Sequence, residues 1–152
     1  PHTAVDLNRL AMEVIELLTP ESRDQKVSLA VDLATEPLIV HADPIQIQQV
    51  IVNLIRNAID AVQPMPAKRR IITVRSQSTP EGIELVVEDQ GPGIHPDIFS
   101  QLGTSILSTK KEGLGMGLSL SRSILQAHGG TLFLIASRVG TKIGLRLPIT
   151  NR

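Results

Sequence analysis

The chain has 152 residues, of which 41% are hydrophobic and 20% charged, and its 15 basic residues balance its 15 acidic ones. This is typical of one soluble globular domain, whose core must be aliphatic because there are two Phe and no Trp or Tyr. The balanced charge argues against nucleic acid as a partner, and the lack of Cys excludes disulfides and thiolate metal sites. No apolar run approaches the roughly 20 residues needed to cross a bilayer, and no direct membrane contact is expected of this segment.

A helical pattern of apolar residues over 5–18 opens the chain. Asp6 or Asn8 is suited to cap this helix, and Thr19-Pro20-Glu21 is expected to end it. Two strands are predicted next, over residues 27–32 and 38–40.

A long helix follows, with Asp43 as N-cap and Pro44 in its first turn, and it runs to about Val62. The later predicted elements are a strand hairpin at 71–75 and 83–88, a short helix at 96–102, a loop at 103–113, a helix at 116–128 and a strand pair at 131–136 and 142–148. This order favours an α+β fold: a two-layer α/β sandwich with a mixed sheet of about five strands, covered on one face by about three helices.

The segment Asp89-Gln90-Gly91-Pro92-Gly93 stands where a predicted strand ends. Because glycine has no Cβ, a ligand can approach the backbone closely there, and the carboxylate can accept a hydrogen bond from a flat polar ring. The simpler alternative is a turn that Asp89 caps and in which Gly91 and Gly93 reverse the chain. The segment therefore indicates a binding site or a turn.

Polar side chains recur along one stripe of the long helix, where Asn53, Asn57 and Asp60 follow one another at helical spacing. An amide oxygen can complete the coordination shell of Mg²⁺ beside phosphates and water. The alternative is the solvated face of an amphipathic helix. The rest of this helix is rich in Ile, Val and Leu, and Asn is a poor helix former, which favours a role for the amides.

The glycine-rich run Gly113-Leu114-Gly115-Met116-Gly117-Leu118 opens the predicted helix 116–128. Free N–H groups and the positive end of the helix dipole would face a phosphate there, and Lys110 and Lys111 just before it could pair with phosphate oxygens. The alternatives are a flexible hinge and solvated lysines. Taken together, these segments predict a nucleotide site without the usual phosphate loop.

In this order the segments resemble the motifs of the catalytic, ATP-binding domain of bacterial sensor histidine kinases, within the superfamily of gyrase, heat-shock chaperone, histidine kinase and mismatch-repair ATPases. The resemblance covers roughly Asp43 to Pro148. The matching segments are 43–58 for the asparagine box, 89–94 for the first glycine box, Phe99 and 105–110 for the phenylalanine box and the lid of the nitrogen-regulation and oxygen-sensing kinases, 113–118 for the second glycine box, and 128–130 with 140–141 for the tail.

The resemblance implies a Bergerat-type fold with ATP and Mg²⁺ as cofactors. Asn57 would coordinate the metal, Asn53 would hold water or phosphate, and Asp89 would accept the adenine amino group with support from Thr141. The catalytic residues would be Asn53, Asn57 and Lys110. The residues that would bind the nucleotide and its metal are Asn53, Asn57, Asp60, Asp89, Gly91, Gly93, Ile94, Thr109, Lys110, Gly113, Leu114, Gly115, Met116, Gly117, Leu118 and Thr141.

The resemblance further implies transfer of the γ-phosphate to a histidine on a separate dimerisation domain, with a response regulator downstream and a cytoplasmic location. In the hydrolytic members a Glu occupies the position of Asn53 and activates water. An amide cannot serve as that base, which favours phosphoryl transfer over hydrolysis. The alternatives are a stand-alone ATPase or clamp, a non-catalytic interaction module, and a serine kinase of the anti-sigma-factor type.

The family's acceptor is a His followed by an acid, and no His in this chain is followed by Asp or Glu. We therefore expect residues 1–19 to be a helix that links from a missing dimerisation and phosphoacceptor domain, and residues 20–152 to form the catalytic domain. The predicted lid also departs from the related kinases, because Ser105-Ile106 and Ser108 stand where these often have Pro-Phe and Thr. We expect this to alter only how the lid packs.

Overall fold

The structure, a computed structural model, describes residues 1–92, 112–137 and 139–149. Its elements are β1 (Thr3–Asp6), α1 (Leu7–Asp24), β2 (Ser28–Asp32), β3 (Ile39–Ala42), α2 (Pro44–Ala61), the 3-10 turn η1 (Ala67–Arg69), β4 (Ile71–Thr79), β5 (Gly82–Asp89), α5 (Glu112–Ala127), β6 (Thr131–Ser137) and β7 (Gly140–Leu147). The predicted short helix at 96–102 and almost all of the predicted loop lie outside the described residues.

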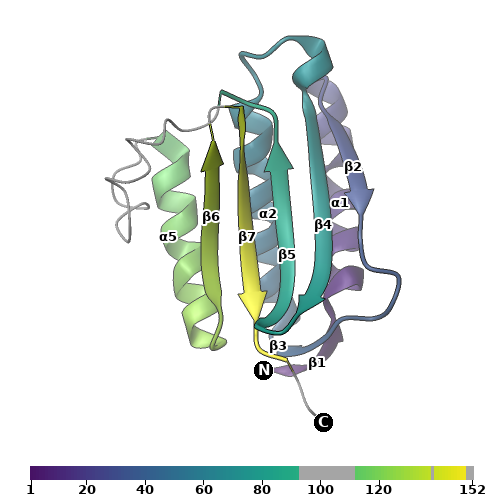
Figure 1. Cartoon of the computed structure of the whole chain (residues 1–152), viewed down its shortest axis with the longest axis vertical. Helices are drawn as coiled ribbons and strands as arrows, with labels where there is room; N and C mark the ends of the chain where they lie inside the picture. The colour runs from purple at the N-terminus through teal and green to yellow at the C-terminus, as the bar shows by residue number, and fades with distance from the viewer. Residues whose placement is uncertain (93–111, 138, 150–152) are drawn as a thin grey trace.

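Five strands form one mixed sheet in the order β2-β4-β5-β7-β6. β2 runs parallel to β4, and every other neighbouring pair in this sheet is antiparallel. α1, α2 and α5 are stacked against the sheet (Figure 1). The predicted α+β sandwich is therefore confirmed.

The core lies between the helices and the inner face of the sheet, and it is aliphatic as the composition requires. Along β5, Ile83, Leu85 and Val87 point inward, as expected from the twofold alternation of a strand. The largest fully buried side chains are Leu7, Leu18, Leu38, Ile47, Ile51, Leu54, Ile55, Ile59, Ile72, Leu85, Leu125 and Leu145. Both α1 and α2 contribute to this one cluster, so α1 packs as part of the domain.

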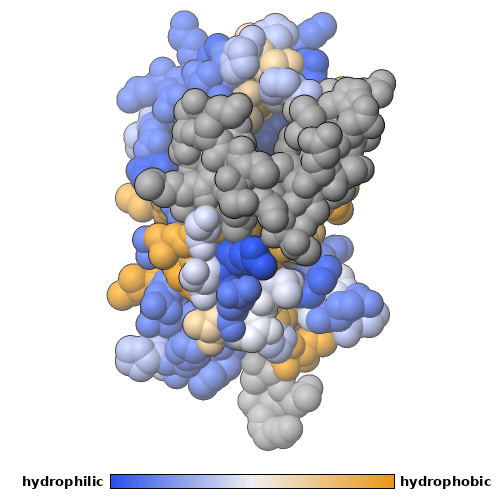
Figure 2. Space-filling model, turned by 90° about the vertical axis from the view of Figure 1, so that its left-hand side faces the viewer, coloured by the Kyte–Doolittle hydropathy of each residue, from blue (hydrophilic) through white to orange (hydrophobic). Residues whose placement is uncertain are grey.

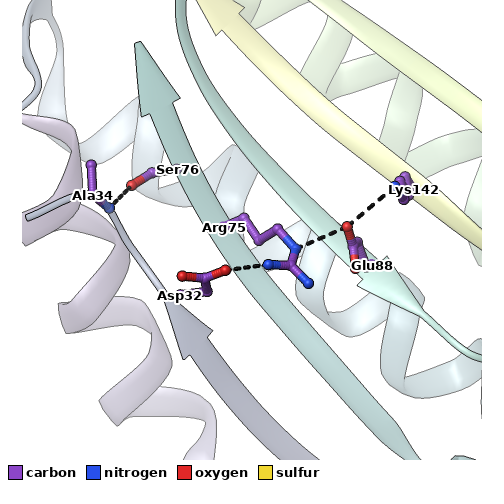
Figure 3. Close-up of polar contacts among 6 residues, drawn as sticks. All are labelled: Asp32, Ala34, Arg75, Ser76, Glu88 and Lys142. Carbon is purple, nitrogen blue, oxygen red and sulfur yellow. Dashed lines mark hydrogen bonds and ion pairs between the residues drawn. The ribbon is translucent and has the colours of Figure 1, made fainter.

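The outer face of the sheet carries a chain of charged side chains (Figure 3). Arg75 donates to Glu88 at 3.0 Å and also pairs with Asp32, and Lys142 lies 3.5 Å from the same Glu88 carboxylate. These four residues come from four strands and line an open groove of about 580 Å³. Opposite charges in adjacent strands stabilise the pairing modestly, since such exposed pairs contribute about 0.2–1 kcal/mol each.

Over the described residues, the flank on the α5 side is a mixed surface in which hydrophilic and hydrophobic residues are interspersed (Figure 2). On α5 itself, Leu120 is 45% exposed. Among the described residues no helix is both long and apolar enough to span a membrane.

The first helix differs from the prediction at its end. α1 continues through Pro20 to Asp24, so the expected stop at Thr19-Pro20-Glu21 is wrong. The last turn is held by burial: Leu18 and Ser22 are both about 1% exposed, and packing outweighs the backbone hydrogen bond that proline cannot make. The predicted division between residues 19 and 20 therefore falls inside this helix, and its origin as a link from another domain stays a prediction.

Two further elements differ from the prediction. β1 was not expected, and it forms because Thr3–Asp6 pairs antiparallel with β3, a contact between segments far apart in the sequence. α5 begins at Glu112, four residues before the predicted start, so the glycine-rich run 113–117 lies within the helix. Asp6 is the N-cap of α1 and Asp43 that of α2, as expected.

Candidate functional site

The end of β5, the start of β7, the C-terminal end of α2 and the start of α5 lie at one end of the sandwich, the upper end in Figure 1. Asp89 is the last residue of β5 and pairs across the sheet with Thr141 at the start of β7. The C-terminal end of α2 reaches the same place, because a Cβ built on Gly91 would lie 2.8 Å from the Ala61 carbonyl oxygen. The strand-end acid and the asparagine helix therefore meet around Gly91.

Asp89 is partly buried and is held by backbone groups. Its Oδ1 accepts a hydrogen bond from the N–H of Gly91 at 2.8 Å, and its carboxylate is also bonded by the N–H of Thr141. Burial raises the pKa of Asp89, and the two N–H groups oppose this rise. The Asp89 carboxylate is therefore an oriented hydrogen-bond acceptor at the end of β5.

Two glycines keep the space beside Asp89 free of side chains. A Cβ on Gly91 would also lie 3.1 Å from Asp89 Oδ1. At Gly140, which has φ +149°, a Cβ would lie 2.3 Å from the carbonyl oxygen of Asp89, a distance that no side chain tolerates. The backbone on both sides of the acid is therefore packed too closely for any other residue.

The asparagines of α2 are not part of its solvated face. Asn53 is partly buried, and its Nδ2 donates to Ser121 Oγ of α5 at 3.3 Å, where Ser121 is fully buried. Asn57 is also partly buried, and its Nδ2 is buried without a hydrogen-bond partner among the described residues. Asp60, by contrast, is exposed. An unpaired buried amide is costly, which makes Asn57 a candidate for contact with a ligand.

The second glycine run lies at the start of α5, and its last member, Leu118, is buried in the core at 2% exposure. α5 packs along α2, and the bond between Asn53 and Ser121 joins the two helices. Gly93, Ile94, Thr109 and Lys110 lie outside the described residues.

Two residues at this end of the molecule were missed by sequence reasoning. Ser121 contacts Asn53, but it belongs to none of the quoted motifs. Arg69 donates to the carbonyl oxygens of Gly91 and Val139, at 3.2 and 3.3 Å. In the sequence it stands in the run Lys68-Arg69-Arg70, which resembles an ordinary solvated stretch, so no local signal distinguished it.

The sequence is similar to those of known proteins. Residues 42–151 match the family described as "Histidine kinase-, DNA gyrase B-, and HSP90-like ATPase". The chain is 38% identical over 129 residues to the C4-dicarboxylate transport sensor protein DctS of Rhodobacter capsulatus, an alignment that covers 85% of this chain and 20% of DctS. It is 37% identical over 134 residues to the sensor protein FixL of Bradyrhizobium diazoefficiens, covering 88% and 26%. The chain thus spans about a fifth to a quarter of these curated relatives.

Solved structures agree over nearly the whole chain. The catalytic domain of histidine kinase ThkA superposes with a TM-score of 0.81 at 28% identity, covering 99% of this chain and 97% of that one. The mycobacterial sensor histidine kinase MprB gives a TM-score of 0.79 at 25% identity, with 98% of both chains covered. The matched family takes in the asparagine helix, the strand-end acid and the glycine helix, and the chain therefore belongs to the histidine kinase, DNA gyrase B and HSP90-like ATPase family.

Proposed function

We propose that this domain binds Mg-ATP and presents the γ-phosphate to a histidine on a separate dimerisation domain of a two-component sensor kinase. The observation that carries the proposal is the meeting of two groups at one end of the fold. Asp89 ends β5, and Gly91 touches Ala61, which lies one helical turn beyond Asn57 on α2. One nucleotide would then contact both residues, with its base on Asp89 and its metal ion on Asn57.

The adenine would lie against Asp89. Its exocyclic amino group would donate to the carboxylate, which the N–H groups of Gly91 and Thr141 already orient. The glycine at position 91 lets the backbone after β5 pack against Ala61 and so keeps its N–H on the carboxylate that would accept the base. Gly93 and Ile94 would extend this contact, and Thr141 would support it from the neighbouring strand.

The residues at the other end of the pocket fit a divalent cation beside phosphates. Asn57 carries a buried amide that lacks a partner among the described residues, and a half-turn of that amide brings Oδ1 to the same position. Amide oxygens are hard ligands of the kind that Mg²⁺ accepts. When bound, Mg²⁺ would neutralise phosphate charge. Asn53, held by Ser121, would keep phosphate or water in place, and Asp60 would stand one turn from Asn57.

The glycine run of α5 would bind the phosphates. Gly113, in the first turn of α5, would offer a free backbone N–H group near the positive end of the helix dipole. Gly115 and Gly117 would let the phosphates approach the helix closely, beside Leu114, Met116 and Leu118. Thr109 and Lys110 would belong to a lid over 103–112, with Lys110 pairing with phosphate oxygens.

The chemistry expected of such a pocket is positioning rather than covalent catalysis. The amide of Asn53 cannot take a proton from water, so hydrolysis by a protein base at that position is disfavoured. The acceptor histidine would come from a neighbouring domain. Histidine kinase ThkA is known in complex with the response regulator TrrA, and the matching ThkA chain gives a TM-score of 0.80 at 27% identity. We therefore propose a response regulator as the downstream partner, and the cytoplasm as the place of both.

The proposal is tested by calorimetric titration of ATP into the domain, with Mg²⁺ and with a chelator. Wild type should bind, and the chelator should weaken binding. Asp89→Ala should abolish most of the affinity, whereas Glu88→Gln should leave it unchanged, because Glu88 faces Arg75 and Lys142 on the outer face. Absence of binding by wild type, or equal binding by Asp89→Ala, would reject the proposed function.

A further inference from the structure

Arg69 ties together two turns that meet at the adenine end of the site. It is the last residue of η1 and is partly buried. One terminal nitrogen, Nη2, donates to the carbonyl oxygen of Gly91 at 3.2 Å and to that of Val139 at 3.3 Å. Gly91 follows β5, and Val139 lies in the turn between β6 and β7. The two hydrogens of a single guanidinium nitrogen can thus bridge segments that are 48 residues apart by number.

Both bridged turns also contact Asp89. The N–H of Gly91 donates to Asp89 Oδ1 at 2.8 Å. On the other side, Val139 precedes Gly140, which lies against the Asp89 carbonyl, and the next N–H, that of Thr141, bonds the Asp89 carboxylate. Arg69 therefore holds the two backbone segments whose N–H groups orient the acid.

We propose that Arg69 is a positioning residue of the nucleotide pocket, which sets the direction of the Asp89 carboxylate and with it the preference for a purine that carries an exocyclic amino group. This inference rests on the proposed function, because it assumes that Asp89 reads the base. Removing the guanidinium would leave two carbonyl oxygens without this donor and would let the two turns separate. The acid would remain, but its orientation would be less defined.

The neighbouring Arg70 provides a matched control. It donates to backbone carbonyl oxygens too, those of Met65 and Gln25 at 3.0 Å and that of Gln63. Its partners join the end of α2 and the end of α1 to the start of β4, and none of them belongs to the two turns that Arg69 bridges. Substitution of Arg70 should therefore lower stability as much as substitution of Arg69, without affecting which base is bound.

The experiment compares ATP with ITP, whose base lacks the amino group that Asp89 would accept. Dissociation constants of both Mg-nucleotides are measured for wild type, Arg69→Ala, Arg69→Lys and Arg70→Ala. Arg69→Ala should weaken ATP binding by about tenfold and ITP binding much less, so that the preference for ATP falls. Arg69→Lys, which keeps a cation with several donors, should recover part of the preference, and Arg70→Ala should keep all of it.

A second readout needs no nucleotide. In Arg69→Ala the amide protons of Gly91 and Thr141 should exchange with solvent faster than in wild type, and in Arg70→Ala they should not. Equal losses for ATP and ITP in Arg69→Ala, with unchanged exchange at these amides, would overturn the inference. If wild type failed to bind ATP, the proposed function would fall, whereas the exchange experiment would still decide whether Arg69 holds the two turns.

Discussion

At the scale of single residues, the fold makes the charged form of Asp89 less favourable than it is in water. Burial raises its pKa, and the N–H groups of Gly91 and Thr141 lower it by less. An acid with a raised pKa destabilises the folded state while it is charged. This penalty applies above the folded pKa, is relieved as the pH falls through it, and is gone below the unfolded value near ~3.9.

Because the pKa of Asp89 is raised, the ligand-free domain should become relatively more stable as this residue is protonated. As the pH is lowered from neutral toward the ordinary titration range of Asp, the melting temperature of wild type should rise relative to that of Asp89→Asn, which carries no titrating group at this position. Calorimetry of both proteins in matched buffers measures the difference. A difference that stays constant with pH would show that the charge of Asp89 has no energetic cost in the fold.

The close contact at Gly91 gives a second prediction. In Gly91→Ala the new Cβ would lie 2.8 Å from the Ala61 carbonyl oxygen, so backbone must shift, at a cost of about 1–3 kcal/mol in unfolding free energy. ATP affinity should fall as well, because the same shift moves Asp89. Gly144→Ala is the control: its Cβ would meet the ring of Phe133 at 2.4 Å on the outer face of the sheet. Denaturant melts should show both variants destabilised, and titrations should show only Gly91→Ala impaired in binding.

At this scale the sequence singles out a residue where it belongs to a local pattern. Asp89 follows a clear strand and precedes glycines, and Asn53 and Asn57 share a helical stripe, so these three could be named as candidates from the sequence. Arg69 and Ser121 could not be found in this way. Their partners, Gly91 and Asn53, are distant in sequence, and such contacts depend on how the elements pack.

At the scale of elements, Pro20 is an exception to the usual rules for helices. It lies in the interior of α1, where its ring cannot donate the hydrogen bond that position 20 would otherwise make. Pro20→Ala should raise the unfolding free energy by about 1–2 kcal/mol, after allowance for the greater freedom of the unfolded chain. Pro44→Ala is the matched control, because Pro44 opens α2, where no such bond is expected. Denaturant unfolding that left Pro20→Ala no more stable than wild type would contradict this reasoning.

The cap of α2 allows a prediction with the opposite pH dependence to that of Asp89. The Asp43 carboxylate accepts from the N–H groups of Ile45 and Gln46, at 3.0 and 3.2 Å, and the bond from Gln46 is the main cause of its lowered pKa. A lowered pKa stabilises the fold above the unfolded pKa, and this gain is lost as the pH falls through the folded one. Asp43→Ala should therefore lower the melting temperature at neutral pH and differ less from wild type in strong acid.

Strong end signals explain why some elements were predicted well. The pair Asp43-Pro44 predicts the first residue of α2 correctly. The hairpin β4–β5 is predicted from a turn sequence that separates two apolar runs. β1 has four residues and makes its bonds only with a distant strand, so its own sequence gave no comparable signal. The stop assigned to α1 was wrong because the burial of Leu18 and Ser22 prevailed over local preference.

At the scale of the whole molecule, nucleotide binding should stabilise the domain as a unit. A ligand that binds only the folded state stabilises it by about 2.7 kcal/mol at a concentration one hundred times its Kd. Mg-ATP at that excess should raise the melting temperature of wild type, and the rise should be lost in Asn57→Ala, whose side chain can no longer contact the metal. A full thermal shift in Asn57→Ala would remove Asn57 from the proposed metal site.

The two-layer sandwich could be predicted from the sequence, because the order of elements and their periodicity are local properties. The arrangement of the strands could not. β2 pairs in parallel with β4, although α2 and β3 lie between them in the chain, and β7 lies between β5 and β6, so that these two do not pair with each other. These pairings are decided by burial of the inner face and by the covering helices.

The parallel pairing of β2 with β4 has a consequence for how the chain folds. Ser28 is opposite Ile71, so this pairing encloses all of α2, whereas the β4–β5 hairpin needs only a tight turn. Long closures cost more entropy and are made later, and the hairpin is therefore the natural starting point for folding. β2 would join last and leave first, and kinetic experiments on substitutions in β2 would then show faster unfolding with little effect on the refolding rate.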